Sequence, residues 1–340
     1  MMDRLSNGQT FLPDGAGQPV ALGVGGVGGA GTGDSRLEPP SRNTKEQKRE
    51  ALVDGNSHKV VWSALVLVEM VAGFLRFSAH FPAITTDILS RVSELLRLFN
   101  SRTTQLVLGA GAIHSSARLK SISAKHLALC SQSLGLVRAL LPHARAALAA
   151  RLSPKHQPLL VEMDRAAEDY RDHRDKILRK FVSMIEELLE ARSAALKSTD
   201  WDDPSAKGSA GGRGAGGTEP CQFTADVRKG VMAMHNVLQQ QLPPEQLQDV
   251  FHRIFTLLNR KVPECFERDG MPPSTAAGRQ RILDDVGFMA NALRTLRGVD
   301  ATALHLEQAF EARYGSKPGV AGSVTSGDGE SGGGEQESGA

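Results

Sequence analysis

Apolar residues recur at three- and four-residue intervals along most of the chain, which is the spacing of helices that bury one face. The clearest short run, between residues 86 and 99, has its apolar positions at Ile88, Val92, Leu95, Leu96 and Phe99. The longest run predicts one helix over residues 160–198, with the stripe Leu160, Met163, Ala167, Tyr170, Arg174, Ile177, Phe181, Met184 and Leu188. Such a helix would be about 60 Å long at 1.5 Å per residue, which favours an elongated rod over a compact globule.

Other segments repeat the helical pattern with clear start and stop residues. Residues 58–77 are apolar nearly all round, which predicts a helix buried on several sides. Ser123 is of a residue type that caps helix N-termini, so the next helix is expected to begin there. Pro142 lacks a backbone N–H, so it should end or kink that helix.

The last third of the chain predicts further helices. The first has the stripe Val227, Val231, Met234 and Leu238. Pro243 and Pro244 suit the first turn of the next helix, whose stripe is Leu247, Val250, Phe251, Ile254, Leu257 and Leu258. The last clear stripe is Ile282, Val286, Met289, Leu293 and Leu296.

Gly-rich segments divide the chain into two folded parts. Residues 1–57, 200–220 and 315–340 are rich in Gly and polar residues, so burial there cannot offset the entropy of ordering the backbone. We expect these segments to be disordered termini and a flexible linker. Between them, residues 58–199 and 221–314 are each expected to form a helical bundle. Strand alternation is missing, so the predicted fold class is all-α, an elongated stack of helical bundles.

Composition excludes several classes of function. The 40 Lys and Arg residues nearly balance the 38 Asp and Glu, and the chain has only two Trp and two Tyr. Nucleic-acid-binding domains instead concentrate positive charge and stack bases on aromatic rings, so no nucleic-acid partner is expected.

The sequence favours a soluble, cytosolic protein. Cys130, Cys221 and Cys265 lie far apart, which favours a reducing compartment. The N-terminus lacks the pattern of a secretory signal. The most apolar run, residues 60–75, is interrupted by Glu69 and is shorter than the roughly 20 residues that span a bilayer. It is therefore interpreted as a buried helix, with no transmembrane segment.

Candidate chemistry is sparse, and neither a cofactor, a small-molecule substrate nor enzymatic activity is expected. Gly109 and Gly111 begin a dinucleotide-binding pattern, but His114 stands where the third glycine should be. Four residues could together bind a divalent metal: Asp169, Asp172, His173 and Asp175. On a helix, however, Asp169, Asp172 and His173 should point outward beside basic residues that can pair with them.

One basic stretch has an ambiguous role. Arg118, Lys120 and Lys125 surround the predicted helix start at Ser123, where the helix dipole favours anions. They could simply be part of a solubilising loop. Alternatively, they are a contact site for an acidic protein surface or a phosphoinositide headgroup.

The sequences of four segments resemble a known protein family. SELLRLFNSRTTQLVLGAGA (93–112) and LKSISAKHLALCSQSL (119–134) closely resemble the C-terminal region of the vacuolar protein sorting-associated protein 54 family. Residues 142–177 look like its continuation, and residues 227–255 fit the next segment in the right order. That family supplies a subunit of the Golgi-associated retrograde protein (GARP) tethering complex.

The resemblance implies a fold and a function. It implies the rod of helical bundles shared by multisubunit tethering complexes, and a role in tethering endosome-derived vesicles at the trans-Golgi network. The implied partners are the other subunits of the complex, SNARE proteins through the family's N-terminal part, and the endosomal membrane through its C-terminal part. The protein would be cytosolic and peripheral at trans-Golgi and endosome membranes.

Two alternatives remain open. A syndetin-like subunit of the endosomal recycling complex would have a comparable helical region, and a generic helical scaffold would have no trafficking role. Residues 1–57 do not resemble the family's N-terminal coiled coil. We therefore expect the sequence to be a fragment or a truncated gene model.

Overall fold

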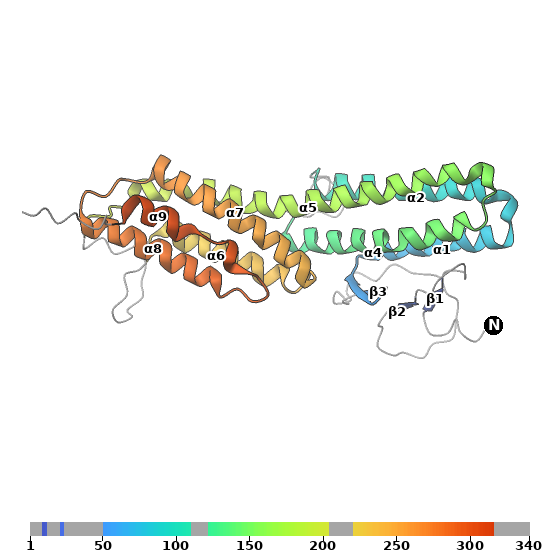
Figure 1. Cartoon of the computed structure of the whole chain (residues 1–340), viewed down its shortest axis with the longest axis horizontal. Helices are drawn as coiled ribbons and strands as arrows, with labels where there is room; N and C mark the ends of the chain where they lie inside the picture. Colours follow the sequence, from blue (N-terminus) through green and yellow to red (C-terminus); the bar gives the residue numbers. More distant parts are fainter. Residues whose placement is uncertain (1–8, 12–20, 24–49, 110–121, 204–219, 316–340) are drawn as a thin grey trace, which may run out of the picture.

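Most described residues lie in α-helices that are arranged as a long rod (Figure 1). The computed structural model describes residues 9–11, 21–23, 50–109, 122–203 and 220–315. The helices are α1 (Trp62–His80), α2 (Thr85–Val107), α4 (Ala124–Ala149), α5 (Val161–Ser193), α6 (Gln222–Leu238), α7 (Pro244–Asp269), α8 (Ala276–Arg294) and α9 (Leu306–Tyr314). Short 3-10 helices are η2 (Pro82–Ile84), η3 (Pro154–Leu160), η4 (Ala194–Ser198) and η5 (Ala301–Ala303). The predicted all-α, elongated fold is confirmed for this part of the chain.

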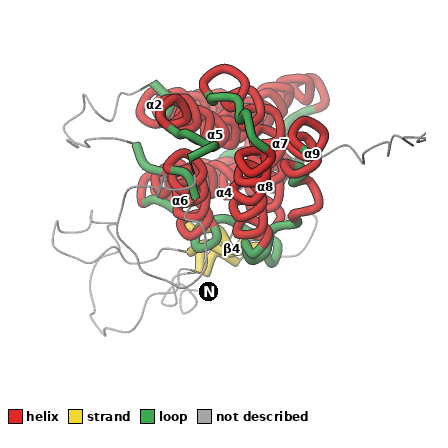
Figure 2. Tube along the Cα trace, turned by 90° about the vertical axis from the view of Figure 1, so that its left-hand side faces the viewer, coloured by secondary structure: helices red, strands yellow, loops and turns green. Residues whose placement is uncertain are grey.

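Helix α5 runs along both halves of the rod (Figure 1). Its N-terminal half packs against α2 and α4, and with α1 these helices form the first bundle. Its C-terminal half packs against α6 and α7, and with α8 and α9 these form the second bundle. At 1.5 Å per residue its 33 residues extend about 50 Å. Figure 2 looks along the rod and shows the helices end-on.

The buried face of α5 agrees only partly with the predicted stripe. The buried positions are Met163, Ala166, Tyr170, His173, Ile177, Phe181, Ile185, Leu189 and Ser193. The predicted stripe has four of these and is displaced by one residue at four others, which it placed at Ala167, Arg174, Met184 and Leu188. These four are half-buried, because α5 contacts helices on several sides and its covered face is broad.

The second bundle confirms the predicted stripes. All the apolar positions that the sequence assigned to α6, α7 and α8 are buried. Helix α7 begins at Pro244, which lies in its first turn as the sequence predicted, whereas Pro243 comes one residue earlier as the N-cap. Helix α9 was not predicted, because nine residues offer too few turns to show a period; it contributes the buried Leu306 and Phe310.

Helix α4 confirms one predicted boundary and corrects another. Ser123 is its N-cap, and the side chain of His126 in turn accepts from the Ser123 backbone N–H at 3.2 Å. Pro142 does not end the helix, which continues to Ala149. A proline removes a single hydrogen bond, and buried residues on both sides of it, such as Leu141 and Ala144, retain their packing.

Two short antiparallel strand pairs lie within the first 59 residues. Strands β1 (Gln9–Phe11) and β2 (Ala21–Gly23) pair with each other, as do β3 (Glu50–Val53) and β4 (Asn56–Lys59). The turn of the second hairpin is Asp54–Gly55, with φ of 49° and 80°, as in the two-residue turns that match strand twist. Ala51 and Val53 are buried and cluster with Leu136 and Leu140 of α4. The sequence analysis did not predict this hairpin. The predicted linker and tail fall mostly outside the described residues.

Candidate functional site

The predicted basic site is only partly described. Arg118 and Lys120 lie outside the described residues, as do residues 110–114 of the glycine-containing loop. Lys125 is exposed in the first turn of α4, directly after the N-cap Ser123. The contact site for an acidic surface or headgroup therefore stays a prediction.

One end of the first bundle exposes a group of large apolar side chains. Two connections meet at this end of the rod: η2, between α1 and α2, and η3, between α4 and α5 (Figure 1). We call the exposed apolar residues at these connections the apolar end: Phe77, Phe81, Ile84, Leu159 and Val161. Phe77 is 59% exposed and Phe81 57%. Large exposed apolar groups of this kind mark contact sites for partners or membranes.

The apolar end continues along the outer face of α1. One face of α1 buries Ala64, Leu67 and Leu75 in the bundle, whereas Met70 and Phe77 on another face remain exposed. The prediction that this helix is buried on several sides was therefore only partly right. Among the described residues, α1 is the one helix long and apolar enough to span a membrane by length and composition, with 28% of its apolar window buried. Its packing against α2 and α4 is that of a bundle helix.

Two basic residues are close in sequence to the residues of the apolar end. Lys155 in η3 and His80 at the end of α1 are exposed, and neither has an ion pair within the described residues. Other charges of the bundle are paired on its surface, such as Arg145 with Asp164 at 2.7 Å. Apolar side chains close in sequence to an unpaired lysine suit an anionic membrane surface, which attracts Lys and Arg and accepts apolar groups.

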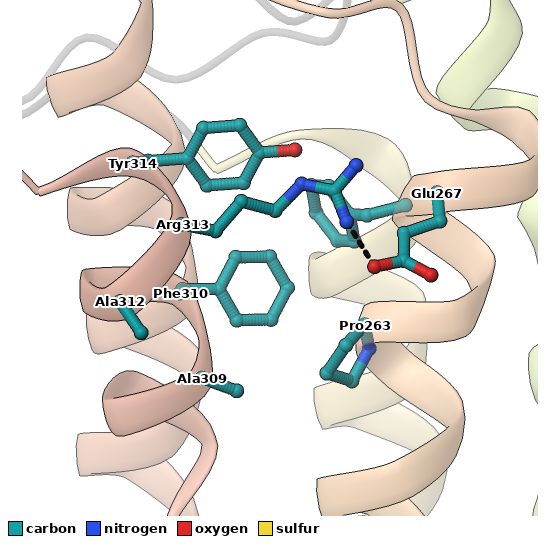
Figure 3. Close-up of a pocket in the computed structure, with 8 residues that line it drawn as sticks. Pro263, Glu267, Ala309, Phe310, Ala312, Arg313 and Tyr314 are labelled. Atoms are coloured by element: carbon teal, nitrogen blue, oxygen red, sulfur yellow. Dashed lines mark hydrogen bonds and ion pairs between the residues drawn. The ribbon is translucent and has the colours of Figure 1, made fainter.

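The second bundle has a small pocket between α7 and α9. Figure 3 shows the rings of Phe310 and Tyr314 on α9 pointing toward α7, which carries Pro263, with an ion pair between Arg313 and Glu267 at the edge of the pocket. Its volume is about 350 Å³. The walls are mostly apolar, and they hold neither a nucleophile nor an acid–base pair suited to catalysis.

Two buried polar side chains of the rod, His173 and Asp285, have hydrogen-bond partners on neighbouring helices. His173 was predicted to point outward, which is wrong: it is 3% exposed, and its Nδ1 lies 2.7 Å from Asn100 Oδ1 on α2. Its partner there is an amide rather than a charge. Asp285 on α8 accepts hydrogen bonds from the backbone N–H of Cys221 at 3.0 Å and the hydroxyl of Thr224 at 2.9 Å, at the start of α6.

The cysteines and acidic residues show no reactive arrangement in the described segments. All three cysteines are buried and unpaired. Burial raises the pKa of the Cys130 and Cys221 thiols to about 12, so each remains protonated and unreactive. No group of three or more His, Cys, Asp or Glu side chains suited to a metal ion occurs among the described residues.

A rod of helical bundles with an open apolar end defines an elongated helical scaffold. Comparison with known proteins identifies its family. Residues 55–188 match the family model described as "Vps54-like protein", which covers α1, α2, α4 and most of α5. The chain belongs to this family, which confirms the resemblance of its sequence.

Curated relatives extend the match beyond the family model. The chain is 30% identical over 276 residues to vacuolar protein sorting-associated protein 54 of Homo sapiens, a match that covers 81% of this chain and 26% of that protein. For the Arabidopsis thaliana protein of that name, described as chloroplastic, the identity is 30% over 252 residues, 73% of this chain and 23% of the relative. The Drosophila melanogaster protein is 25% identical over 254 residues, 74% and 24%. The chain thus spans about a quarter of the length of these relatives.

Proposed function

We propose that the chain is a non-enzymatic part of a vesicle-tethering complex that acts in retrograde transport from endosomes to the trans-Golgi network. Its membership of the Vps54-like family carries this proposal, because the relatives are named for vacuolar protein sorting. The same name favours a GARP-type complex over the syndetin-containing one. Other subunits of that complex are the proposed protein partners, and SNARE proteins would bind through the part of the relatives that the chain does not match.

The rod shape suits a passive mechanical role. Each helix buries one apolar face, and at about 25 cal/mol per Å² of buried apolar area such interfaces stabilise the stack without a ligand. Helix α5 extends through both bundles and keeps them in line. Surfaces at the two ends of the rod are thereby held apart, as a link between two membranes requires.

The apolar end is the part of the described surface that we assign to the membrane. Phe77 lies in the last turn of α1 and Phe81 directly follows the helix, and phenylalanine side chains insert readily at the boundary of headgroups and acyl chains. Lys155 would add attraction to anionic lipids. The protein would then be cytosolic and peripheral at endosome and trans-Golgi membranes.

Recruitment in cells tests the proposal. The complete chain, fused to a fluorescent reporter, is expected to form puncta that overlap endosomal and trans-Golgi markers. The double variant Phe77→Ser/Phe81→Ser should become diffuse at unchanged abundance. Leu98→Ser is the matched control, because Leu98 is also exposed and apolar but lies on α2, away from the apolar end; this variant should stay punctate.

Flotation with synthetic vesicles separates a membrane from a protein partner. Purified chain should float with vesicles containing phosphatidylserine, and the double variant should not. If the chain forms puncta in cells but does not float with vesicles, the apolar end binds a protein partner rather than lipid. A diffuse signal from the folded wild-type chain would contradict membrane recognition by this part of the family.

A further inference from the structure

A cavity of about 870 Å³ lies where the two bundles meet. Its walls come from the hairpin β3–β4, the middle of α4, the N-terminal half of α5 and the turn between α6 and α7. At this junction Gln132 of α4 donates a hydrogen bond to Gln246 of α7 at 3.0 Å. The cavity is therefore bounded by elements of both bundles.

Basic side chains converge on this cavity around Gly135. A Cβ atom at Gly135 would lie 3.4 Å from Nδ1 of His58 and 3.5 Å from Cζ of Arg174. His58 of the hairpin and Arg174 of α5 therefore both lie beside the space that Gly135 leaves on α4. Arg138 follows Gly135 by one turn of α4 and also lines the cavity, as does Lys59.

The positive charge in the cavity lacks a matching negative charge. Glu245 is the one acidic side chain among the described residues that line it. Within the described part of the chain, neither Arg138 nor Arg174 has an ion pair, and the buried atoms Nε of Arg174 and both ring nitrogens of His58 have no hydrogen-bond partner. Buried cationic groups are normally paired, because desolvating a charge is costly.

Local electrostatics agree with this imbalance. Burial and, secondarily, the charge of Arg174 lower the pKa of His58. Burial and then the charge of Arg138 lower the pKa of Arg174. By contrast, Arg253, one helix away on α7, pairs with Asp175 and Asp249, each at 3.1 Å. The cavity is thus lined by cations that repel one another, whereas the arginine on the adjoining surface is paired with carboxylates.

The start of α7 adds a further attraction for anions. The 26-residue helix begins at the cavity, with its N-cap Pro243 and first residues Pro244, Glu245 and Gln246 among the lining residues. Pro243 and Pro244 have no N–H, so the contribution comes from the backbone N–H groups of Glu245 and Gln246, which lie in the first turn, lack a helical acceptor and favour anions.

We propose that this junction cavity binds a small anion with several phosphate groups, held mainly by Arg138 and Arg174. Guanidinium groups form paired hydrogen bonds with phosphate oxygens, and here they approach from two helices. A single phosphate would not fill a space of this volume, whereas a compact molecule with several phosphates could reach both arginines and the start of α7 together. Such a ligand would tie α4, α5 and α7 to one another. The inference does not depend on the tethering role.

Calorimetric titration of the purified complete chain at about 150 mM salt is the test. Tripolyphosphate and inositol hexakisphosphate are expected to bind saturably, and inorganic phosphate much more weakly. The double variant Arg138→Gln/Arg174→Gln should lose affinity by about tenfold or more. Without ligand, its thermal midpoint should not fall, because the two arginines have no ion pair to lose. Arg138→Gln alone, at an exposed side chain, provides a second variant that should fold normally and lose part of the affinity.

Arg145→Gln/Arg171→Gln is the matched control. It removes the same charge from the same two helices, at the half-buried Arg145 and the exposed Arg171, which pair with Asp164 and Glu168 away from the cavity. The control should keep wild-type affinity; an equal loss would show attraction to general positive charge and overturn the site. So would the absence of saturable binding.

Two further arms identify the source of the phosphates. Flotation with vesicles containing phosphatidylinositol 4-phosphate, lost in the double variant, would assign the cavity to a lipid headgroup. Binding of inositol hexakisphosphate without flotation would assign it to a soluble polyphosphate. A tetra-aspartate peptide that binds as tightly as tripolyphosphate would overturn the phosphate assignment in favour of an acidic peptide.

Discussion

The hydroxyl of Tyr170 on α5 donates a hydrogen bond to the backbone carbonyl oxygen of Leu96 on α2, across 3.0 Å, and both residues are buried. Tyr170→Phe removes this bond but keeps the ring. Because the net value of such a bond is about 1 kcal/mol, the free energy of unfolding should fall by about that amount in denaturant titrations. Tyr314→Phe is the control, since the Tyr314 hydroxyl has no hydrogen bond to a described residue; an equal loss there would contradict the assignment.

Phe181 and Leu188 should differ in their importance for stability. Both belong to the predicted stripe of α5, but Phe181 is fully buried, whereas Leu188 is half-buried over Gly230 of α6. Phe181→Ser should lower the free energy of unfolding by about 4 kcal/mol, and Leu188→Ser by less than half as much. Thermal and denaturant unfolding of both variants measures the ranking. Preserved stability in Phe181→Ser would contradict the register of α5.

His173 should make the stability of the first bundle depend on pH. Burial and, secondarily, the positive charge of Lys176 lower the pKa of His173 to about 4. In the unfolded chain the pKa of a histidine is about 6.5. Between these values the unfolded state binds more protons, so this contribution is complete above pH about 6.5 and is lost as the pH falls towards 4.

The variant His173→Gln isolates this contribution. The difference in unfolding free energy between wild type and variant should shrink by on the order of 2 kcal/mol on acidification from pH 7 to 4. His58 and the carboxylates titrate in both proteins and cancel in the difference. A difference that does not change with pH would mean that His173 takes up a proton without loss of its contacts to Asn100 and Thr104.

Charge reversal tests the predicted basic site before α4. Lys120→Glu/Lys125→Glu should reduce recruitment to membranes or partners several-fold if these residues contact an acidic surface. Lys176→Glu/Lys229→Glu, at exposed lysines of α5 and α6, makes the same change in net charge and is the control. Unchanged recruitment of the double variant would leave the basic stretch as a solubilising loop.

Periodicity predicted the second bundle better than the first. Each stripe assigned to α6, α7 and α8 is buried, and α6 and α7 are strongly amphipathic helices that offer one obvious face. In α1 nearly every side chain is apolar, so the pattern could not show that Met70 and Phe77 lie on an open face. Only the position of the neighbouring helices decides which side is covered.

The junction cavity and the burial of His173 could not be predicted, because they depend on contacts between residues that are distant in sequence. His58, Arg138 and Arg174 come from three elements, and no local motif links them. The sequence placed Arg174 in the α5 stripe as if it were core and His173 outside, whereas His173 is buried and Arg174 lines the junction cavity. A shift of one residue on a helix turns a side chain by about 100°, so periodicity alone could not tell the two apart.

The sharing of α5 between the two bundles has a thermodynamic consequence. Each half of α5 is a wall of one core, and residues such as Tyr170 and Phe181 sit on one continuous backbone, so unfolding of either bundle leaves the other half of the helix with a free end at the junction. The bundles should therefore melt together, and scanning calorimetry should record a single heat-absorption peak with matching calorimetric and van't Hoff enthalpies. Two resolved peaks would show that the helix can break at the junction, and that the rod has a joint there.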